Sequence, residues 1–108
     1  MNKMICHSTD STFKSDLRNE GLTLVNFWAP WCSPCRMFAS VLEDYDATRQ
    51  DDVRIVKINV DENEETGPFF GVMSLPTTIL FKDGKPVDKK IGYMPKEALA
   101  GWVSSQIL

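Results

Sequence analysis

An apolar run leads into a helix start in Leu22-Thr23-Leu24-Val25-Asn26-Phe27-Trp28-Ala29-Pro30-Trp31-Cys32-Ser33-Pro34-Cys35. Residues 22–28 are rich in apolar side chains on both alternating faces, which is typical of a central strand covered by helices above and below. The strand ends at Ala29-Pro30, and Pro34 suits the first turn of a helix, where a missing N–H costs nothing. That helix is predicted to continue to about Arg49, because apolar residues recur at helical spacing at Met37, Phe38, Val41, Leu42 and Tyr45.

The pattern continues on both sides of this unit. Upstream, residues 8–19 are predicted to form a helix that begins at serine and threonine caps and ends before Gly21. A short edge strand is expected near Met4. Downstream, residues 53–60 form a second apolar, β-branched strand, and residues 61–70 have a polar start followed by a short helix that ends at Gly71.

Two further strands and a helix complete the chain. Residues 77–82 and 87–91 flank the turn sequence Asp83-Gly84-Lys85-Pro86, which indicates a β-hairpin. Pro95 opens the last helix, whose apolar side is predicted to carry Ala98, Leu99, Trp102, Val103 and Ile107. Alternating strands and helices require a parallel core, and the hairpin adds an antiparallel edge. We therefore predict an α/β fold with a central mixed β-sheet of four to five strands, flanked by helices on both faces.

The length of 108 residues indicates a single domain spanning residues 1–108. Hydrophobic residues make up 43% and charged residues 25%, which excludes disordered and fibrous classes. A net charge of −3 provides no cationic surplus for nucleic acid, and no apolar run approaches the roughly 18 residues that cross a bilayer. The first residues hold no apolar stretch of signal-peptide length, so a cytoplasmic location is expected. Nothing indicates an obligate partner, so a monomer is expected.

Cys32 and Cys35 are the strongest chemical signal in the sequence. Because they lie three residues apart at a helix start, their sulfurs share one face and can close a small disulfide ring. Unsatisfied N–H groups and the positive end of the helix dipole converge at Cys32 and stabilise a thiolate, which is the attacking species in disulfide exchange. Cys35 lies one turn inside the helix, so it is expected to be less exposed and to resolve the mixed disulfide.

The same C-x-x-C spacing occurs in zinc sites, and Cys6 and His7 would add suitable ligands. Adjacent residues point in different directions, however, so we predict no metal site. Cys6 is instead expected to pack near the N-terminal strand, and His7 is expected to lie at the surface. The odd number of cysteines, three, leaves at least one thiol free.

A set of motifs recurs in order along the chain: Val25-Asn26-Phe27-Trp28-Ala29-Pro30-Trp31-Cys32-Ser33-Pro34-Cys35-Arg36-Met37, Val60-Asp61, Phe70-Gly71-Val72, Leu75-Pro76-Thr77, Phe81-Lys82-Asp83-Gly84 and Gly92. On these residues the chain resembles the thioredoxin family over most of its length. The resemblance implies the thioredoxin fold and a cis Leu75–Pro76 peptide packed against the cysteines. It also implies that backbone groups beside Pro76 pair with an extended substrate strand.

The resemblance further implies a substrate-binding apolar rim around the reactive sulfur, formed by Trp31, Ser33, Pro34, Val60, Leu75, Pro76, Ile91, Gly92 and Tyr93. Six residues would also support catalysis: Trp31, Ser33, Pro34, Asn26, Lys57 and Pro76. Trp31 directly precedes Cys32 on a turn and is expected to form a surface platform. Gly92 would let a substrate backbone approach closely.

Asn26 departs from the family, most members of which have Asp there, loosely paired with a lysine that matches Lys57. The strand pattern makes Asn26 a buried polar residue and places Lys57 on an otherwise apolar row. An amide cannot accept a proton at neutral pH, so Cys35 is expected to lose its proton through water or directly to the leaving sulfur of Cys32. Ser33 stands where glycine is commoner; either any small residue fits the turn, or Ser33 shifts the redox poise.

The predicted function is that of a thiol–disulfide oxidoreductase in which Cys32 is the nucleophile and Cys35 the resolving cysteine. The resemblance implies disulfide-containing protein substrates and regeneration by a flavin-dependent thioredoxin reductase that draws on NADPH. No G-x-G-x-x-G fingerprint is present, so no bound cofactor is expected. Two alternatives stay open: a thiol oxidant or disulfide isomerase, and a non-catalytic peptide-binding module that uses the groove around Pro76.

Overall fold

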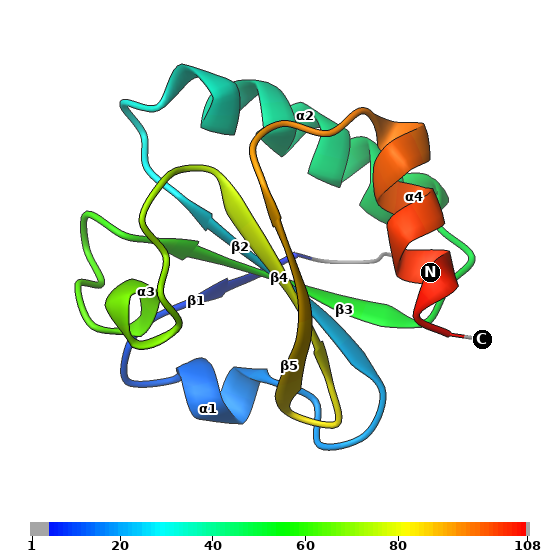
Figure 1. Cartoon of the computed structure of the whole chain (residues 1–108), viewed down its shortest axis with the longest axis horizontal. Helices are drawn as coiled ribbons and strands as arrows, with labels where there is room; N and C mark the ends of the chain where they lie inside the picture. Colours follow the sequence, from blue (N-terminus) through cyan, green and yellow to red (C-terminus); the bar gives the residue numbers. More distant parts are fainter. Residues whose placement is uncertain (1–4, 108) are drawn as a thin grey trace.

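The computed structural model describes residues 5–107, which form a five-stranded mixed β-sheet with helices on both faces (Figure 1). The strands are β1 (Cys6–Ser8), β2 (Leu22–Trp28), β3 (Val53–Asn59), β4 (Thr77–Lys82) and β5 (Lys85–Ile91). The helices are α1 (Phe13–Asp16), α2 (Ser33–Thr48), α3 (Thr66–Phe69) and α4 (Lys96–Ser105). The α/β fold predicted from the sequence is confirmed.

The strand order β1-β3-β2-β4-β5 places β2 at the centre of the sheet. β1, β3 and β2 run parallel, while β4 is antiparallel to β2 and β5 is antiparallel to β4. Helices α2 and α4 cover one face, and α1 and α3 lie on the other (Figure 1). Because β2 is central and parallel to β3, the residues that follow it emerge at the carboxyl edge of the sheet, where sites of open α/β sheets usually form.

The two faces of the sheet carry separate hydrophobic cores. The core under α2 and α4 contains Leu22, Leu24, Phe38, Leu42, Tyr45, Val53, Ile55, Leu80, Met94, Leu99, Trp102 and Val103. The opposite core contains Phe13, Val25, Phe27, Val56, Ile58, Ile79 and Phe81. Even-numbered residues of β2 face the first core and odd-numbered ones the second, as the alternation of side chains along a strand requires.

The helix predicted over residues 8–19 is wrong in extent, because α1 holds only Phe13–Asp16. Ser8 pairs with Ile58 and belongs to β1, so the chain must first leave the sheet through a turn. The carboxylate of Asp10 is also engaged outside any helix, by the backbone N–H groups of Glu65 and Thr66. The edge strand expected near Met4 is found at β1, whereas Met4 itself lies outside the described residues.

The hairpin differs in one detail from its prediction. β5 begins at Lys85 and not at residue 87, because Asp83 and Gly84, with φ angles of 54° and 83°, complete the turn.

Three residues expected on apolar helix faces are instead exposed: Met37 on α2, Ala98 on α4, and Ile107, which follows α4. No helix within residues 5–107 combines the length and hydropathy that a membrane crossing needs.

Candidate active site

Cys32 and Cys35 are joined by a disulfide at the start of α2, with Cα atoms 5.2 Å apart. Cys32 is the N-cap residue of the helix, and its sulfur accepts a hydrogen bond from the backbone N–H of Cys35 at 3.3 Å. The predicted ring closure and helix-terminal position are therefore both present. A sulfur that already accepts a hydrogen bond from a helix N–H is well placed to carry negative charge when the disulfide is reduced.

Segments far apart in the sequence surround the disulfide. Trp28, Ala29, Val60 and Leu75 pack against the two cysteines. The Leu75–Pro76 peptide is cis, as the resemblance implied.

The carbonyl of Pro76 accepts a hydrogen bond of 2.8 Å from the N–H of Gly92. The loops that precede β4 and follow β5 therefore meet at one end of the sheet, beside the helix start that carries the cysteines.

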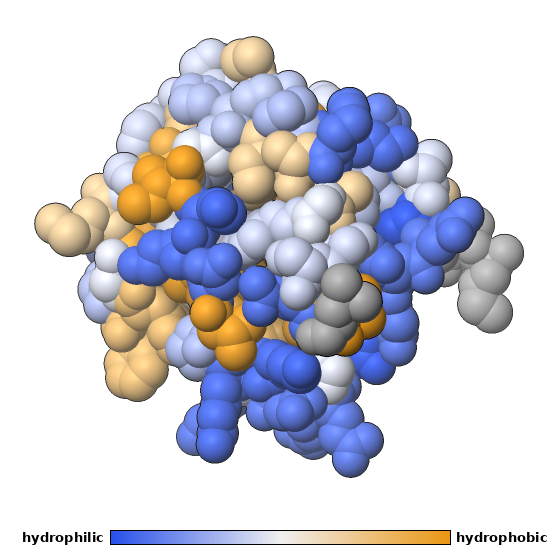
Figure 2. All heavy atoms as spheres, turned by 45° about the vertical axis from the view of Figure 1, so that its right-hand side comes forward, coloured by the Kyte–Doolittle hydropathy of each residue, from blue (hydrophilic) through white to orange (hydrophobic). Residues whose placement is uncertain are grey.

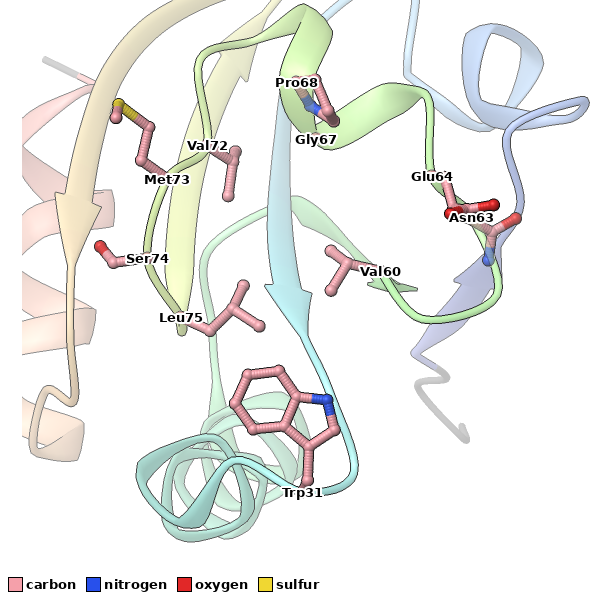
Figure 3. Close-up of a pocket in the computed structure, with 10 residues that line it drawn as sticks. All are labelled: Trp31, Val60, Asn63, Glu64, Gly67, Pro68, Val72, Met73, Ser74 and Leu75. Carbon is pink, nitrogen blue, oxygen red and sulfur yellow. The ribbon is translucent and has the colours of Figure 1, made fainter.

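An open groove of about 360 Å³ begins at Trp31. Its lining residues are Trp31, Val60, Asn63, Glu64, Gly67, Pro68, Val72, Met73, Ser74 and Leu75. Figure 3 shows the side chains of Val60, Val72 and Leu75 pointing toward one another, with the ring of Trp31 at one end of the groove. Because Val60 and Leu75 also pack against the cluster of Ala29, Cys32 and Cys35, the apolar floor of the groove leads toward the disulfide.

Trp31 is 68% exposed, which agrees with the predicted surface platform and not with a core position. Its indole N–H donates a hydrogen bond of 3.1 Å to the carboxylate of Asp61. Ser33 and Pro34 are exposed in the first turn of α2. Asp61, which belongs to the polar start of residues 61–70, therefore also helps to hold the indole in place.

Ile91, Gly92 and Tyr93 lie near Pro76 but do not line the groove that begins at Trp31. Ile91 is 67% and Tyr93 45% exposed, so both present apolar surface to solvent. Gly92 has a φ of 96°, and a Cβ at this position would meet no atom within 4 Å. The space beside the Gly92 backbone is therefore open, as a close approach by another backbone requires.

Two predicted support residues, Asn26 and Lys57, are paired on neighbouring strands and are both buried. The side-chain amide of Asn26 donates a hydrogen bond of 3.3 Å to Oγ1 of Thr78. Nζ of Lys57 lies 4.7 Å from the centroid of the Trp28 ring. Burial lowers the pKa of Lys57, and the negative charge of Glu43 opposes that effect.

The residues on the α3 side of the groove were not predicted from the sequence to belong to the site. Asn63, Glu64, Gly67, Pro68, Met73 and Ser74 belong to it. The available signal was their place in the chain, since they lie between Val60-Asp61 and Leu75-Pro76, two motifs that were assigned to the site.

The remaining candidate ligands stay apart from the disulfide. Cys6 is a free, half-buried cysteine that packs against the opposite core, and His7 is exposed. Within residues 5–107, no group of three or more His, Cys, Asp or Glu side chains is arranged to hold a metal ion.

Comparison with known proteins gives a consistent result. A family model described as Thioredoxin matches residues 4–105. The thioredoxin of Bacillus subtilis (strain 168) is 48% identical over 103 residues, which is 95% of this chain and 98% of that protein. The thioredoxin of Alicyclobacillus acidocaldarius is 53% identical over 91 residues, 84% of this chain and 87% of that protein. The thioredoxin of Listeria monocytogenes is 52% identical over 96 residues, 89% of this chain and 92% of that protein. The chain therefore belongs to the thioredoxin family.

Proposed function

We propose that this protein reduces disulfide bonds in other proteins, with Cys32 as the nucleophile and Cys35 as the resolving cysteine. A thiol–disulfide oxidoreductase needs a sulfur that is easily ionised and a second thiol within bonding reach. The observation that carries the proposal is the Cys32–Cys35 disulfide at the start of α2. The Cys32 sulfur accepts a hydrogen bond from a helix N–H, and an open groove lies beside the helix start.

The reaction proceeds by two thiolate–disulfide exchanges. The thiolate of reduced Cys32 attacks one sulfur of the substrate disulfide, forms a mixed disulfide and releases the other substrate sulfur as a thiolate. Cys35 then loses its proton and attacks the sulfur of Cys32, which releases the second substrate sulfur. The substrate gains two electrons, and the protein is left with the Cys32–Cys35 disulfide. The amide of Asn26 cannot take up a proton, so the proton of Cys35 passes to water or to the departing sulfur.

The substrate lies along the rim residues Trp31, Val60, Leu75, Pro76, Ile91, Gly92 and Tyr93. Two observations support this placement of the substrate. An apolar groove leads toward the disulfide on one side, and the space beside Gly92 is open on the other. Ser33 and Pro34, exposed in the first turn of α2, directly follow the attacking residue Cys32 in the chain. An extended substrate segment would pair with backbone groups beside Pro76, as in recognition by strand addition.

A dithiol that acts as a reductant has to be regenerated after each turnover. The family resemblance supports a flavin-dependent thioredoxin reductase that uses NADPH as the partner in this step. A compartment that keeps thiols reduced suits such a cycle, which favours the cytoplasm. Action as a monomer is part of this proposal; on the one face that Figure 2 shows, the hydrophobic residues form small patches between hydrophilic ones.

The test is reduction of a protein disulfide, with dithiothreitol as electron donor, by three single variants. We expect Cys32→Ser to lose the activity, because no nucleophile is left. Cys35→Ser, reduced first and then freed of dithiothreitol, is expected to accumulate a mixed disulfide at Cys32, because attack proceeds but no second thiol releases the substrate. Cys6→Ser is the matched control and keeps the wild-type rate. A Cys32→Ser variant that stays active, or a mixed disulfide trapped at Cys6, would refute the assignment.

The reduction potential separates this function from the oxidant and isomerase alternative. A midpoint near the roughly −270 mV of a well-characterised thioredoxin is the expected result. A midpoint near about −180 to −120 mV would instead place the protein with isomerases and oxidants.

A further inference from the structure

Among the described residues that line the groove beginning at Trp31, Glu64 carries the one ionisable side chain. In Figure 3 Glu64 lies on the segment that precedes α3 and Met73 on the segment that follows it, with Val60 of the apolar floor between them. The other lining residues are neutral. A peptide that lies on the floor of the groove therefore passes beside a single carboxylate.

The carboxylate of Glu64 is free to take a partner. Its side chain is exposed, and it makes no hydrogen bond or ion pair within residues 5–107. Asp61 differs in this respect, because its carboxylate accepts the indole N–H of Trp31. A cationic group of a bound peptide can therefore pair with Glu64 without breaking an interaction inside the protein.

The backbone on both sides of Glu64 is held in place. The side-chain amide of Asn63 donates a hydrogen bond of 3.0 Å to the carbonyl of Asn59, and its oxygen accepts one of 2.9 Å from the N–H of Asp10. On the other side, the N–H of Glu65 donates to the carboxylate of Asp10 at 3.1 Å. The point from which Glu64 reaches the groove is thus fixed before a substrate binds, which lowers the entropy cost of pairing with it.

The electrostatic surroundings of Glu64 have the same sign. Four of the five residues in Asp61-Glu62-Asn63-Glu64-Glu65 are acidic, and none of the described lining residues of the groove is a lysine or an arginine. A basic segment of a substrate is therefore attracted to this wall of the groove, and an acidic segment is repelled.

We propose that Glu64 is a specificity-determining residue of the groove. An apolar substrate residue beside the attacked cysteine lies on the floor, and a lysine or arginine further along the same extended segment pairs with Glu64. The favoured substrates are therefore protein disulfides with a basic residue near one cysteine. This inference rests on the proposed function and deepens it, because it names which disulfides the groove prefers. No bond forms or breaks at Glu64, and the exchange at Cys32 is the one already described.

The expected size of the preference follows from the exposure of the pair. Ion pairs in contact with solvent are weak, so a basic residue should raise the rate constant of reduction by roughly two- to fivefold. The preference should shrink as salt is added, because the Debye length is about 10 Å at 0.1 M ionic strength and falls to about 3 Å at 1 M.

The experiment measures the second-order rate constant with which the reduced full-length protein reduces peptides that contain one intramolecular disulfide. Each peptide has leucine beside one cysteine, and a variable position, scanned along the residues on either side, holds lysine, glutamine or glutamate. Each rate is divided by that of the same peptide with 2-mercaptoethanol, which corrects for the intrinsic reactivity of the disulfide. At the position that reaches Glu64, we expect the lysine peptide to exceed the glutamine peptide roughly two- to fivefold at low salt.

Three variants connect this ratio to one side chain. Glu64→Gln is expected to bring the ratio close to one, because the charge is removed and the shape is kept. Glu64→Lys is expected to reverse the preference, so that the glutamate peptide becomes the fastest. Glu62→Gln is the matched control, because Glu62 is exposed on the same segment but is not among the described residues that line the groove. It should keep the wild-type ratio.

A wild-type ratio that persists in Glu64→Gln would overturn the inference, and so would an equal loss of the ratio in Glu62→Gln, since the preference would then belong to the whole acidic segment. Reduction of all peptides by the wild type without any charge preference would overturn this inference alone. No reduction of any peptide by the wild type would overturn the proposed function together with it.

Discussion

At the scale of single residues, Asn26 is the position where one substitution changes both stability and chemistry. We predict that Asn26→Asp accelerates the resolving step, because a carboxylate there can accept the proton of Cys35. The same variant is expected to lose about 1–3 kcal/mol of unfolding free energy, since a buried charge must be desolvated even beside Lys57. Stopped-flow decay of the mixed disulfide and chemical denaturation measure the two effects.

Asn26→Leu is the matched control for this prediction. It has a similar size but cannot take up a proton, so its resolving step is not expected to accelerate. It also loses the hydrogen bond to Thr78. If Asn26→Asp left both the resolving rate and the stability unchanged, the proposed role of this position in proton transfer would be refuted.

At the scale of secondary-structure elements, Asp10 fixes the start of α3 and with it one wall of the groove. Its carboxylate accepts hydrogen bonds from the N–H of Glu65 at 3.1 Å and from the N–H and hydroxyl of Thr66 at 3.0 and 2.6 Å. We predict that Asp10→Ala costs about 1–2 kcal/mol of unfolding free energy, as loss of a helix cap does. Urea denaturation of the oxidised protein measures this cost.

The cost of Asp10→Ala should depend on pH. Burial would raise the pKa of Asp10, but the hydrogen bonds from Thr66 and Glu65 together outweigh it and hold the pKa below the ordinary 3.8. A carboxyl group with a lowered pKa stabilises the fold above pH 3.8, and the contribution is lost as the pH falls through the lowered value. The difference between wild type and variant should therefore shrink in acid.

Asp52→Ala is the comparison variant, because it removes the salt bridge of an exposed carboxylate to Arg18. It is expected to cost less than about 1 kcal/mol. Equal costs for the two variants would mean that Asp10 does not act as a cap.

At the scale of the whole molecule, the two cores are expected to unfold together because both are built on β2. Phe38 lies in the core under α2, and Phe81 lies in the opposite core. We predict that Phe38→Ala and Phe81→Ala each cost about 3–5 kcal/mol of unfolding free energy. In each variant, tryptophan fluorescence and far-ultraviolet circular dichroism should report one coincident transition.

Phe69→Ala serves as the reference for this pair, because Phe69 is 82% exposed and its truncation leaves no cavity. Its cost is expected to stay within about 0.5 kcal/mol. Separate transitions for the two spectroscopic signals in either core variant would contradict the prediction of one cooperative unit.

Local sequence patterns were enough to predict the order of the strands and long helices along the chain, and the position of Cys32 and Cys35 at a strand–helix junction. These features are local: alternation, helical spacing and proline placement act over a few residues. For the same reason the end of α2 was predicted to within one residue, at about Arg49 against the observed Thr48. The cis Leu75–Pro76 peptide and the rim residues were reached only through family resemblance, because a single sequence does not specify contacts between distant segments.

Features that depend on contacts between distant segments became visible only in the folded chain. Residues 8–12 are not helical as predicted, because Ser8 pairs with Ile58 of β3, about fifty positions further along the chain. The α3 wall of the groove and the bond from Trp31 to Asp61 likewise form only when separate loops meet. The same is true of Lys57: periodicity predicted that it lies on an apolar row, but only the folded chain sets its ammonium against Trp28 with no bound counter-ion among the described residues.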